Sequence, residues 1–165
     1  MVRRIFKPLN SDSFFLFAAR GTGKSTFIEE HYRSNSLWKI DLLHEEIFDR
    51  YSGKPSLIEN DWAALQIKPE WVFIDEVQRI PALLIHVHRM IENNKQKFIL
   101  SDSSARKLKV LGANLLAGRA FLNHFFPLTF LEWEDQLNLE EVLHWGSLPK
   151  ILHLNHEQQA QYLRT

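Results

Sequence analysis

The chain has no cysteine among its 165 residues. Disulfide bonds are therefore impossible, and metal sites built on thiolates are excluded. The chain also lacks an excess of charge of either sign, because 20 Lys and Arg residues balance 20 Asp and Glu residues. Binding to nucleic acid or to an acidic membrane depends on clustered basic residues, so the overall charge supports neither partner. A local basic patch is still compatible with this balance.

Long apolar runs are also missing. The run over residues 14–19 ends at Arg20. It is too short for the hydrophobic region of a signal peptide, and it is too short to span a bilayer. We therefore expect a cytoplasmic protein with no membrane partner. The 45% of hydrophobic and 24% of charged residues are typical of one well-cored globular domain.

Short apolar runs alternate with helical patterns along the chain, which is typical of a parallel α/β sheet. The predicted strands cover residues 14–17, 37–42, 71–74, 97–100 and 121–126. The predicted helices cover residues 24–32, 44–50, 57–66, 81–93, 105–116, 131–137 and 139–144. We expect a core domain over residues 1–130, followed by a helical segment over residues 131–165.

A phosphate-binding pattern follows the first predicted strand. Residues 18–25 have the sequence AARGTGKS, which matches the P-loop pattern with Ala18 in place of its leading glycine. Backbone N–H groups of such a loop converge on phosphate oxygens, and Gly21 and Gly23 let the backbone approach closely. Lys24 can reach the β- and γ-phosphates, and the Ser25 hydroxyl can bind Mg²⁺. The predicted nucleotide-binding residues are Ala19, Arg20, Gly21, Thr22, Gly23, Lys24, Ser25 and Thr26.

The alternative is a glycine-rich turn that binds nothing. The motif lies between an apolar strand and the start of a helix, where unpaired N–H groups and the positive end of the helix dipole favour an anion. This position favours the nucleotide-binding interpretation.

Two carboxylates follow the third predicted strand. Residues 71–76 have the sequence WVFIDE, in which four apolar residues precede Asp75 and Glu76, as in a Walker B motif. A buried strand carries such residues to the carboxyl edge of the sheet, where ligands of open α/β folds bind. Asp75 is the predicted second Mg²⁺ ligand, and Glu76 is the predicted general base that deprotonates the attacking water. The alternative is a solvated acidic turn, and the P-loop elsewhere in the chain favours the functional interpretation.

Three further residues have both a functional and an ordinary interpretation. Ser101 ends the fourth predicted strand and can contact the γ-phosphate or the attacking water, or it can start a turn. Arg119 can act as an arginine finger from a neighbouring subunit, or it can be a surface arginine. Arg20 can touch phosphate or remain solvated. The eight histidines predict no metal site, because a zinc site needs three or four converging ligands.

Four stretches together resemble a known family. They are FAARGTGKS at 17–25, IDEVQRIP at 74–81, LSDSSARKL at 100–108, and LAGR at 116–119 followed by FPLTF at 126–130. In this order they look like the AAA-type ATPase domain found in many prokaryotes, which precedes a C-terminal domain of uncharacterised function. The resemblance implies a P-loop NTPase fold, an α/β three-layer sandwich with a five-stranded parallel sheet and a short helical C-terminal segment. It places the strand of Ser101 between the P-loop strand and the strand of Asp75, and therefore places Ser101 beside the γ-phosphate.

The resemblance also implies ATP and Mg²⁺ as ligands, and it leaves a homo-oligomer and an unknown protein client as expected partners. Ala18 replaces a glycine of the family, a change that P-loops tolerate. Asp102 also replaces a glycine, and its carboxylate would repel phosphates if it points inward. Residues 161–165 look like the entry to the helix that leads into the family's C-terminal domain. We therefore expect the chain to be a fragment of a longer protein or a degraded gene copy.

The leading hypothesis is Mg²⁺-dependent ATP binding and hydrolysis. One alternative is a nucleotide-binding switch or scaffold with weak or no hydrolysis, motivated by Asp102 and by the expected truncation. A second is a P-loop kinase for a small molecule, against which the adjacent pair Asp75 and Glu76 favours water as the acceptor. A DNA-associated ATPase is a third, and the charge balance gives it no support. The prediction that the nucleotide is ATP rather than GTP rests on the resemblance alone.

Overall fold

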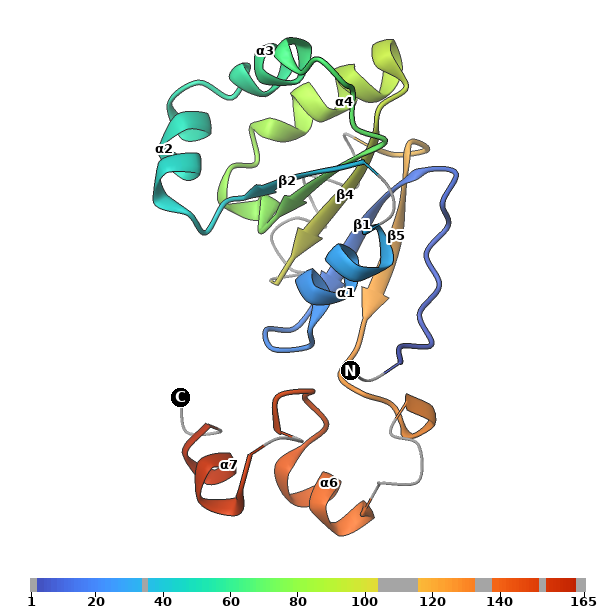
Figure 1. Cartoon of the computed structure of the whole chain (residues 1–165), viewed down its shortest axis with the longest axis vertical. Helices are drawn as coiled ribbons and strands as arrows, with labels where there is room; N and C mark the ends of the chain where they lie inside the picture. Colours follow the sequence, from blue (N-terminus) through green and yellow to red (C-terminus); the bar gives the residue numbers. More distant parts are fainter. Residues whose placement is uncertain (1–2, 34–35, 104–115, 133–137, 152–153, 163–165) are drawn as a thin grey trace.

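Five parallel strands form the centre of the molecule (Figure 1). The computed structural model describes residues 3–33, 36–103, 116–132, 138–151 and 154–162. The strands are β1 (Ser13–Ala18), β2 (Leu37–Asp41), β3 (Trp71–Asp75), β4 (Lys97–Asp102) and β5 (Ala120–Phe125). Their order in the sheet is β2-β3-β4-β1-β5. The predicted five-stranded parallel sheet is confirmed, and so is the place of the Ser101 strand β4 between β1 and β3.

The helices connect and follow these strands. They are α1 (Lys24–His31), α2 (Glu45–Gly53), α3 (Leu57–Ala64), α4 (Leu83–Asn94), α6 (Leu139–Trp145) and α7 (His156–Tyr162), with short 3-10 helices at Val77–Arg79 and Phe130–Glu132. The helix α2 continues to Gly53, past its predicted end at residue 50. The helix predicted over 105–116 lies outside the described residues except for its last residue. So do residues 133–137 of the helix predicted over 131–137.

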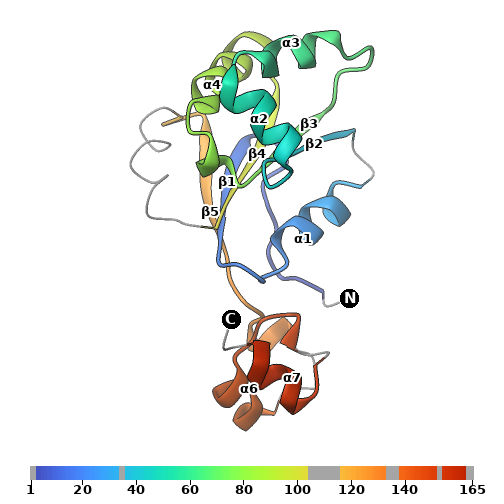
Figure 2. The same cartoon turned by 90° about the vertical axis from the view of Figure 1, so that its left-hand side faces the viewer.

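Two apolar cores cover the two faces of the sheet. Successive side chains of a strand point to opposite faces, so Phe15 and Phe17 of β1 pack with α3 and α4, whereas Phe14 and Leu16 pack with Ile28 of α1. Figure 2 shows α1 on one side of the sheet and α4 on the other. Strands buried on both faces must be apolar at nearly every position. This three-layer arrangement explains why the central strands β1 and β3 are apolar at nearly every position.

The parallel register brings the carboxyl ends of the central strands to one edge. Leu16 of β1 lies beside Ser101 of β4, and Ile74 of β3 lies beside Leu100 of β4. The loop after β1 and the carboxylates at the end of β3 therefore lie at the same edge of the sheet, on either side of β4. Both views show α6 and α7 beyond this edge of the sheet (Figures 1 and 2). Within the described ranges, no helix is both long and apolar enough to cross a membrane.

Candidate functional site

The loop between β1 and α1 has a backbone that suits glycine. Gly21 and Gly23 have φ angles of 78° and 83°, in the left-handed region where other residues are strained. The Thr22 hydroxyl donates to the Ala19 carbonyl at 2.9 Å, which ties the two sides of the loop together. Helix α1 starts directly at Lys24, so the unpaired N–H groups of its first turn lie next to the loop. This is the geometry of an anion site at a helix N-terminus.

The Lys24 side chain lies between the two predicted carboxylates. Its Nζ is 3.6 Å from Asp75 Oδ1 and forms a shorter ion pair with Glu76 Oε1. The Ser25 hydroxyl donates to Asp75 Oδ2 at 2.6 Å. The side chains of Lys24, Asp75 and Glu76 are 9%, 5% and 8% exposed. The structure therefore brings the residues of the phosphate loop into direct contact with the acidic residues at the end of β3.

The Glu76 carboxylate is held by several donors. Burial opposes its ionisation, but hydrogen bonds from Lys24, Ser103 and Gln78, together with the charge of Lys24, outweigh burial and lower the pKa. The Ser103 hydroxyl donates to Oε2 at 2.6 Å. Glu76 also has a left-handed backbone, with φ 59° and ψ 45°, which costs a residue with a Cβ about 1 kcal/mol. Glu76 is therefore a carboxylate at neutral pH, held in a strained turn beside the loop.

Ser101 connects the Asp75 carboxylate with the backbone of Glu76. Its hydroxyl donates to Asp75 Oδ1 and accepts the Glu76 backbone N–H at 3.2 Å. The side chain is fully buried in β4. In this structure its hydrogen bonds therefore go to residues 75 and 76. A contact of Ser101 with a γ-phosphate stays a prediction.

A cavity of about 510 Å³ lies at the phosphate loop. It is lined by the eight predicted nucleotide-binding residues and both carboxylates, together with Leu43: Ala19, Arg20, Gly21, Thr22, Gly23, Lys24, Ser25, Thr26, Leu43, Asp75 and Glu76. Asp102 is fully buried in β4 and is not among the lining residues. Sequence reasoning missed Leu43, which follows β2, and it missed Gln78 and Ser103 as partners of Glu76. Their roles depend on contacts between distant segments, for which the sequence has no local signal.

The two arginines with predicted roles, Arg20 and Arg119, lie at different distances from the cavity: Arg20 lines it and Arg119 does not. Arg20 is exposed and lines the cavity, so it lies where a phosphate can be reached. Arg119 precedes β5, and the register pairs the first residue of that strand with Ser13 at the start of β1. Arg119 is therefore at the opposite edge of the sheet from the loop, where it forms an ion pair with Glu92. It does not take part in this chain's own cavity, and an arginine finger donated to a neighbouring subunit stays a prediction.

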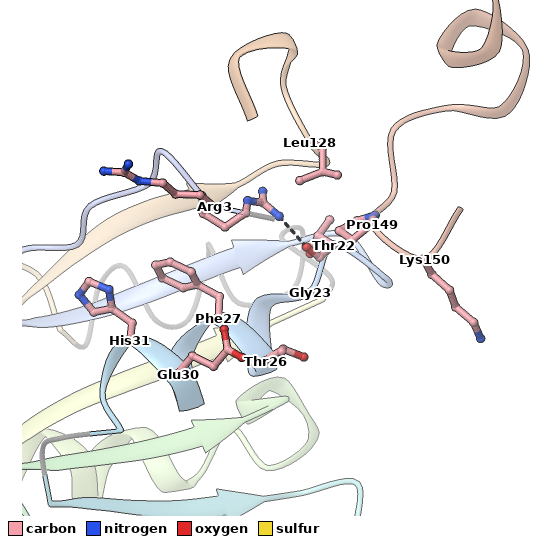
Figure 3. A pocket seen from close by; sticks show the side chains of 11 residues that line it. Arg3, Thr22, Gly23, Thr26, Phe27, Glu30, His31, Leu128, Pro149 and Lys150 are labelled. Atoms are coloured by element: carbon pink, nitrogen blue, oxygen red, sulfur yellow. Dashed lines mark hydrogen bonds between the residues drawn. The ribbon is translucent and has the colours of Figure 1, made fainter. Parts of the chain in front are cut away.

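A second cavity of about 810 Å³ shares Thr22, Gly23 and Thr26 with the first one (Figure 3). Its remaining lining residues come from α1, from the N-terminal segment and from the segment after β5: Arg3, Arg4, Phe27, Glu30, His31, Leu128, Pro149 and Lys150. The cavity combines apolar groups with both signs of charge. It gives a ligand at the loop room to extend along α1.

The residues of the first cavity have the chemistry that a magnesium nucleotide requires. Mg²⁺ prefers oxygen donors, and the Ser25 hydroxyl and the Asp75 carboxylate already lie within one hydrogen bond of each other. Loop amides, a helix N-terminus and a lysine ammonium are groups that stabilise phosphate in proteins, and groups of these three kinds lie at this loop. Among the described residues, no group of three or more His, Asp or Glu side chains is arranged to hold a metal by itself.

A family model described as an AAA domain matches residues 10–134. The comparison with curated proteins finds no match. One solved structure with a similar fold is domain III of the replication initiation protein DnaA from Thermotoga maritima, at 14% identity and a TM-score of 0.43. The match covers 68% of this chain and 54% of that chain, so this chain spans about half of that structure's length.

Proposed function

The chain belongs to the AAA domain family, and from this we propose that it binds Mg-ATP at the loop of residues 19–26 and hydrolyses it. One observation carries the proposal. Lys24, Ser25, Asp75 and Glu76 converge on one cavity, with the Lys24 ammonium 3.6 Å from the Asp75 carboxylate. Two patterns separated by some 50 residues in the sequence thus form a single site of complementary chemistry.

Different groups would bind the phosphates and the Mg²⁺ ion. The loop amides and the Lys24 ammonium would hold the β- and γ-phosphates, and Ser25 and Asp75 would hold Mg²⁺. When bound, Mg²⁺ supplies positive charge against the phosphate oxygens. Lys24 now contacts Glu76, so the γ-phosphate must compete with that carboxylate for the ammonium. Binding would therefore release the Glu76 side chain from Lys24.

The released carboxylate is suited to act as a general base. In this structure burial raises its pKa, but the donors around it, Lys24 first among them, outweigh burial and lower the pKa. Loss of the Lys24 contact would raise that pKa and make the carboxylate a stronger base. It would accept a proton from a water molecule, whose oxygen attacks the γ-phosphorus while the bond from that phosphorus to the β-phosphate oxygen breaks. ADP and phosphate are the products. Ser101 would position both carboxylates, since it hydrogen-bonds the Asp75 side chain and the Glu76 backbone.

The second cavity would receive the rest of the nucleotide. It begins at the loop residues Thr22 and Gly23 and continues past Phe27 of α1. A base needs an apolar surface for stacking, and this ring lies where the cavity extends away from the loop (Figure 3). The preference for ATP over GTP rests on the family.

Glu76→Gln tests the proposal. The amide keeps the shape of the side chain but cannot accept a proton, so we expect ATP binding within about threefold of wild type and phosphate release reduced by at least about a hundredfold. Glu141→Gln is the matched control, because Glu141 is an exposed carboxylate on α6. Unchanged phosphate release by the Glu76→Gln protein would remove the general-base assignment.

The Lys24–Glu76 contact also favours a second candidate, a nucleotide-binding switch with little hydrolysis. A carboxylate held by Lys24, Ser103 and Gln78 is not free to contact water. If ATP binding leaves this arrangement intact, nucleotide would bind without turnover. Tight Mg-ATP binding with no phosphate release from the wild-type protein would establish this candidate instead.

A further inference from the structure

Arg4 makes three hydrogen bonds, one of them to the phosphate loop. Its Nη1 donates to the Thr22 carbonyl at 2.9 Å, its Nε donates to Glu132 Oε1 at 2.9 Å, and its Nη2 donates to the Phe126 carbonyl. The guanidinium also lies 4.0 Å from the centre of the Phe125 ring. Its side chain is only 9% exposed. Arg4 precedes residues 10–134, which the family model covers, so its role does not follow from the family.

Glu132 is the buried partner of Arg4. Besides Arg4, its Oε1 accepts the Ile5 N–H at 2.9 Å, and its Oε2 accepts the Thr129 N–H at 2.9 Å. Burial favours the neutral acid, but these backbone donors and Arg4 outweigh it and lower the pKa of Glu132. A charged pair with side chains only 9% and 2% exposed is costly to bury unless both partners are well hydrogen-bonded. Here both partners are hydrogen-bonded, and the pair joins three segments that are far apart in the sequence.

The bond to Thr22 bears directly on the phosphate loop. In a trans peptide the C=O and the N–H of one unit point in opposite directions, and the described residues contain no cis peptide. A Thr22 carbonyl held by Arg4 therefore turns the Gly23 N–H away from Arg4. The two residues flanking Thr22 are glycines with positive φ, so the loop backbone has little stiffness of its own. The hydrogen bond from Arg4 to the Thr22 carbonyl restrains the loop backbone, which the glycines alone do not.

We propose that Arg4 and Glu132 form a latch that holds the phosphate loop in its nucleotide-binding form and couples it to the segment after β5. The Arg4–Glu132 latch consists of positioning residues. Arg4 also lines the second cavity, but the hydrogen bonds of its guanidinium go to two carbonyls and a carboxylate. Its effect on the ligand is therefore exerted through the orientation of the loop amides. This inference rests on the proposed nucleotide binding, and it names a determinant of affinity outside the two sequence motifs.

Calorimetric titration with Mg²⁺ and a non-hydrolysable ATP analogue tests the latch on the full chain. For Arg4→Ala we expect a dissociation constant raised about tenfold, equivalent to about 1.4 kcal/mol, with an unchanged number of binding sites. A role in general stability would instead lower the number of sites and leave the dissociation constant alone. Arg4→Lys should give an intermediate loss, because an ammonium on a flexible stem does not match three acceptors in a plane.

Two further variants sharpen the comparison. Glu132→Gln places an amide among N–H donors and should weaken binding as Arg4→Ala does. Arg50→Ala is the matched control, since Arg50 pairs with Asp61 at 2.8 Å and lines neither cavity. Its dissociation constant should equal that of wild type. Hydrogen exchange of the amides of residues 20–25, measured without nucleotide, should be faster in the latch variants and unchanged in the control.

The outcomes separate this inference from the proposed function. If Lys24→Ala abolishes binding while the Arg4→Ala and Glu132→Gln proteins bind like wild type, the latch is wrong and the proposed function stands. If the wild-type protein binds no nucleotide, both are wrong. If Arg4→Ala does not fold, Arg4→Lys and Glu132→Gln decide the question by the same titration.

Discussion

Lys24→Met is expected to destabilise the nucleotide-free protein. Methionine replaces the lysine with a side chain of similar length and no charge. In the wild-type structure the ammonium contacts Glu76 Oε1 and lies 3.6 Å from Asp75 Oδ1. The variant would leave both buried carboxylates without their cation.

The size of the effect follows from burial. The three side chains are 5% to 9% exposed, and removing one partner of a buried ion pair costs about 3–5 kcal/mol. Because the pair faces an open cavity of about 510 Å³, we expect the lower end of that range, about 3 kcal/mol. Adding Glu76→Gln removes one of the uncompensated charges, so the double variant should recover about 1–2 kcal/mol.

Equilibrium urea unfolding at neutral pH measures these differences. The single variants, the double variant and wild type form a complete cycle, and Lys54→Met on the exposed Lys54 is the control, expected within about 0.5 kcal/mol of wild type. The reasoning is refuted if Lys24→Met matches wild type in unfolding free energy, or if the two single effects simply add. Either result would mean that the lysine does not compensate the carboxylates.

Three other perturbations have defined outcomes. Gly21→Ala should weaken Mg-ATP binding at least about tenfold, because the φ of 78° strains a residue with a Cβ; the tyrosine hydroxyl of α7 that would lie 2.9 Å from the new Cβ can move aside. Gly53→Ala, whose Cβ meets nothing within 4 Å, should bind like wild type in the same titration. Ser101→Ala removes a buried hydroxyl bonded to Asp75 and should lower the unfolding free energy by about 1–3 kcal/mol and slow phosphate release. Because the pKa of Glu76 is lowered in the folded protein, the ionised side chain stabilises the fold above its ordinary pKa of 4.5, and this contribution is lost as pH falls through the folded pKa. The unfolding free energy should therefore drop below about pH 4.5. The drop should be smaller in the Glu76→Gln protein.

The sheet was predictable from the sequence for a physical reason. A strand buried on both faces must be apolar throughout, and the runs at residues 14–17 and 71–74 have that composition. The loop and the acidic residues were predictable because their chemistry requires glycine, lysine and serine at fixed spacing after one strand and carboxylates after another. The fold confirms the order of these elements. The roles assigned to the individual residues stay predictions.

Contacts between distant segments were not predictable. Arg4 and Glu132 are 128 positions apart, and neither belongs to a local pattern. Helix α7 was not predicted over its full range, since none of its residues is buried and it has no apolar face to recognise. Its Tyr162 nevertheless lies against Gly21. The division of the chain into two parts at residue 130 likewise stays a prediction. Residues from both parts, such as Leu128 and Lys150, line one cavity together with the phosphate loop.

The central claim is that the loop of residues 19–26 and the carboxylates after β3 form one magnesium-nucleotide site. Titrating wild type and Lys24→Ala with Mg-ATP and Mg-GTP, followed by phosphate release from the same samples, tests it most directly. The account predicts saturable Mg-dependent ATP binding with phosphate release by wild type, weaker binding of GTP, and neither binding nor release with Lys24→Ala. Equal ATP binding by both proteins, or no binding by wild type, would contradict it.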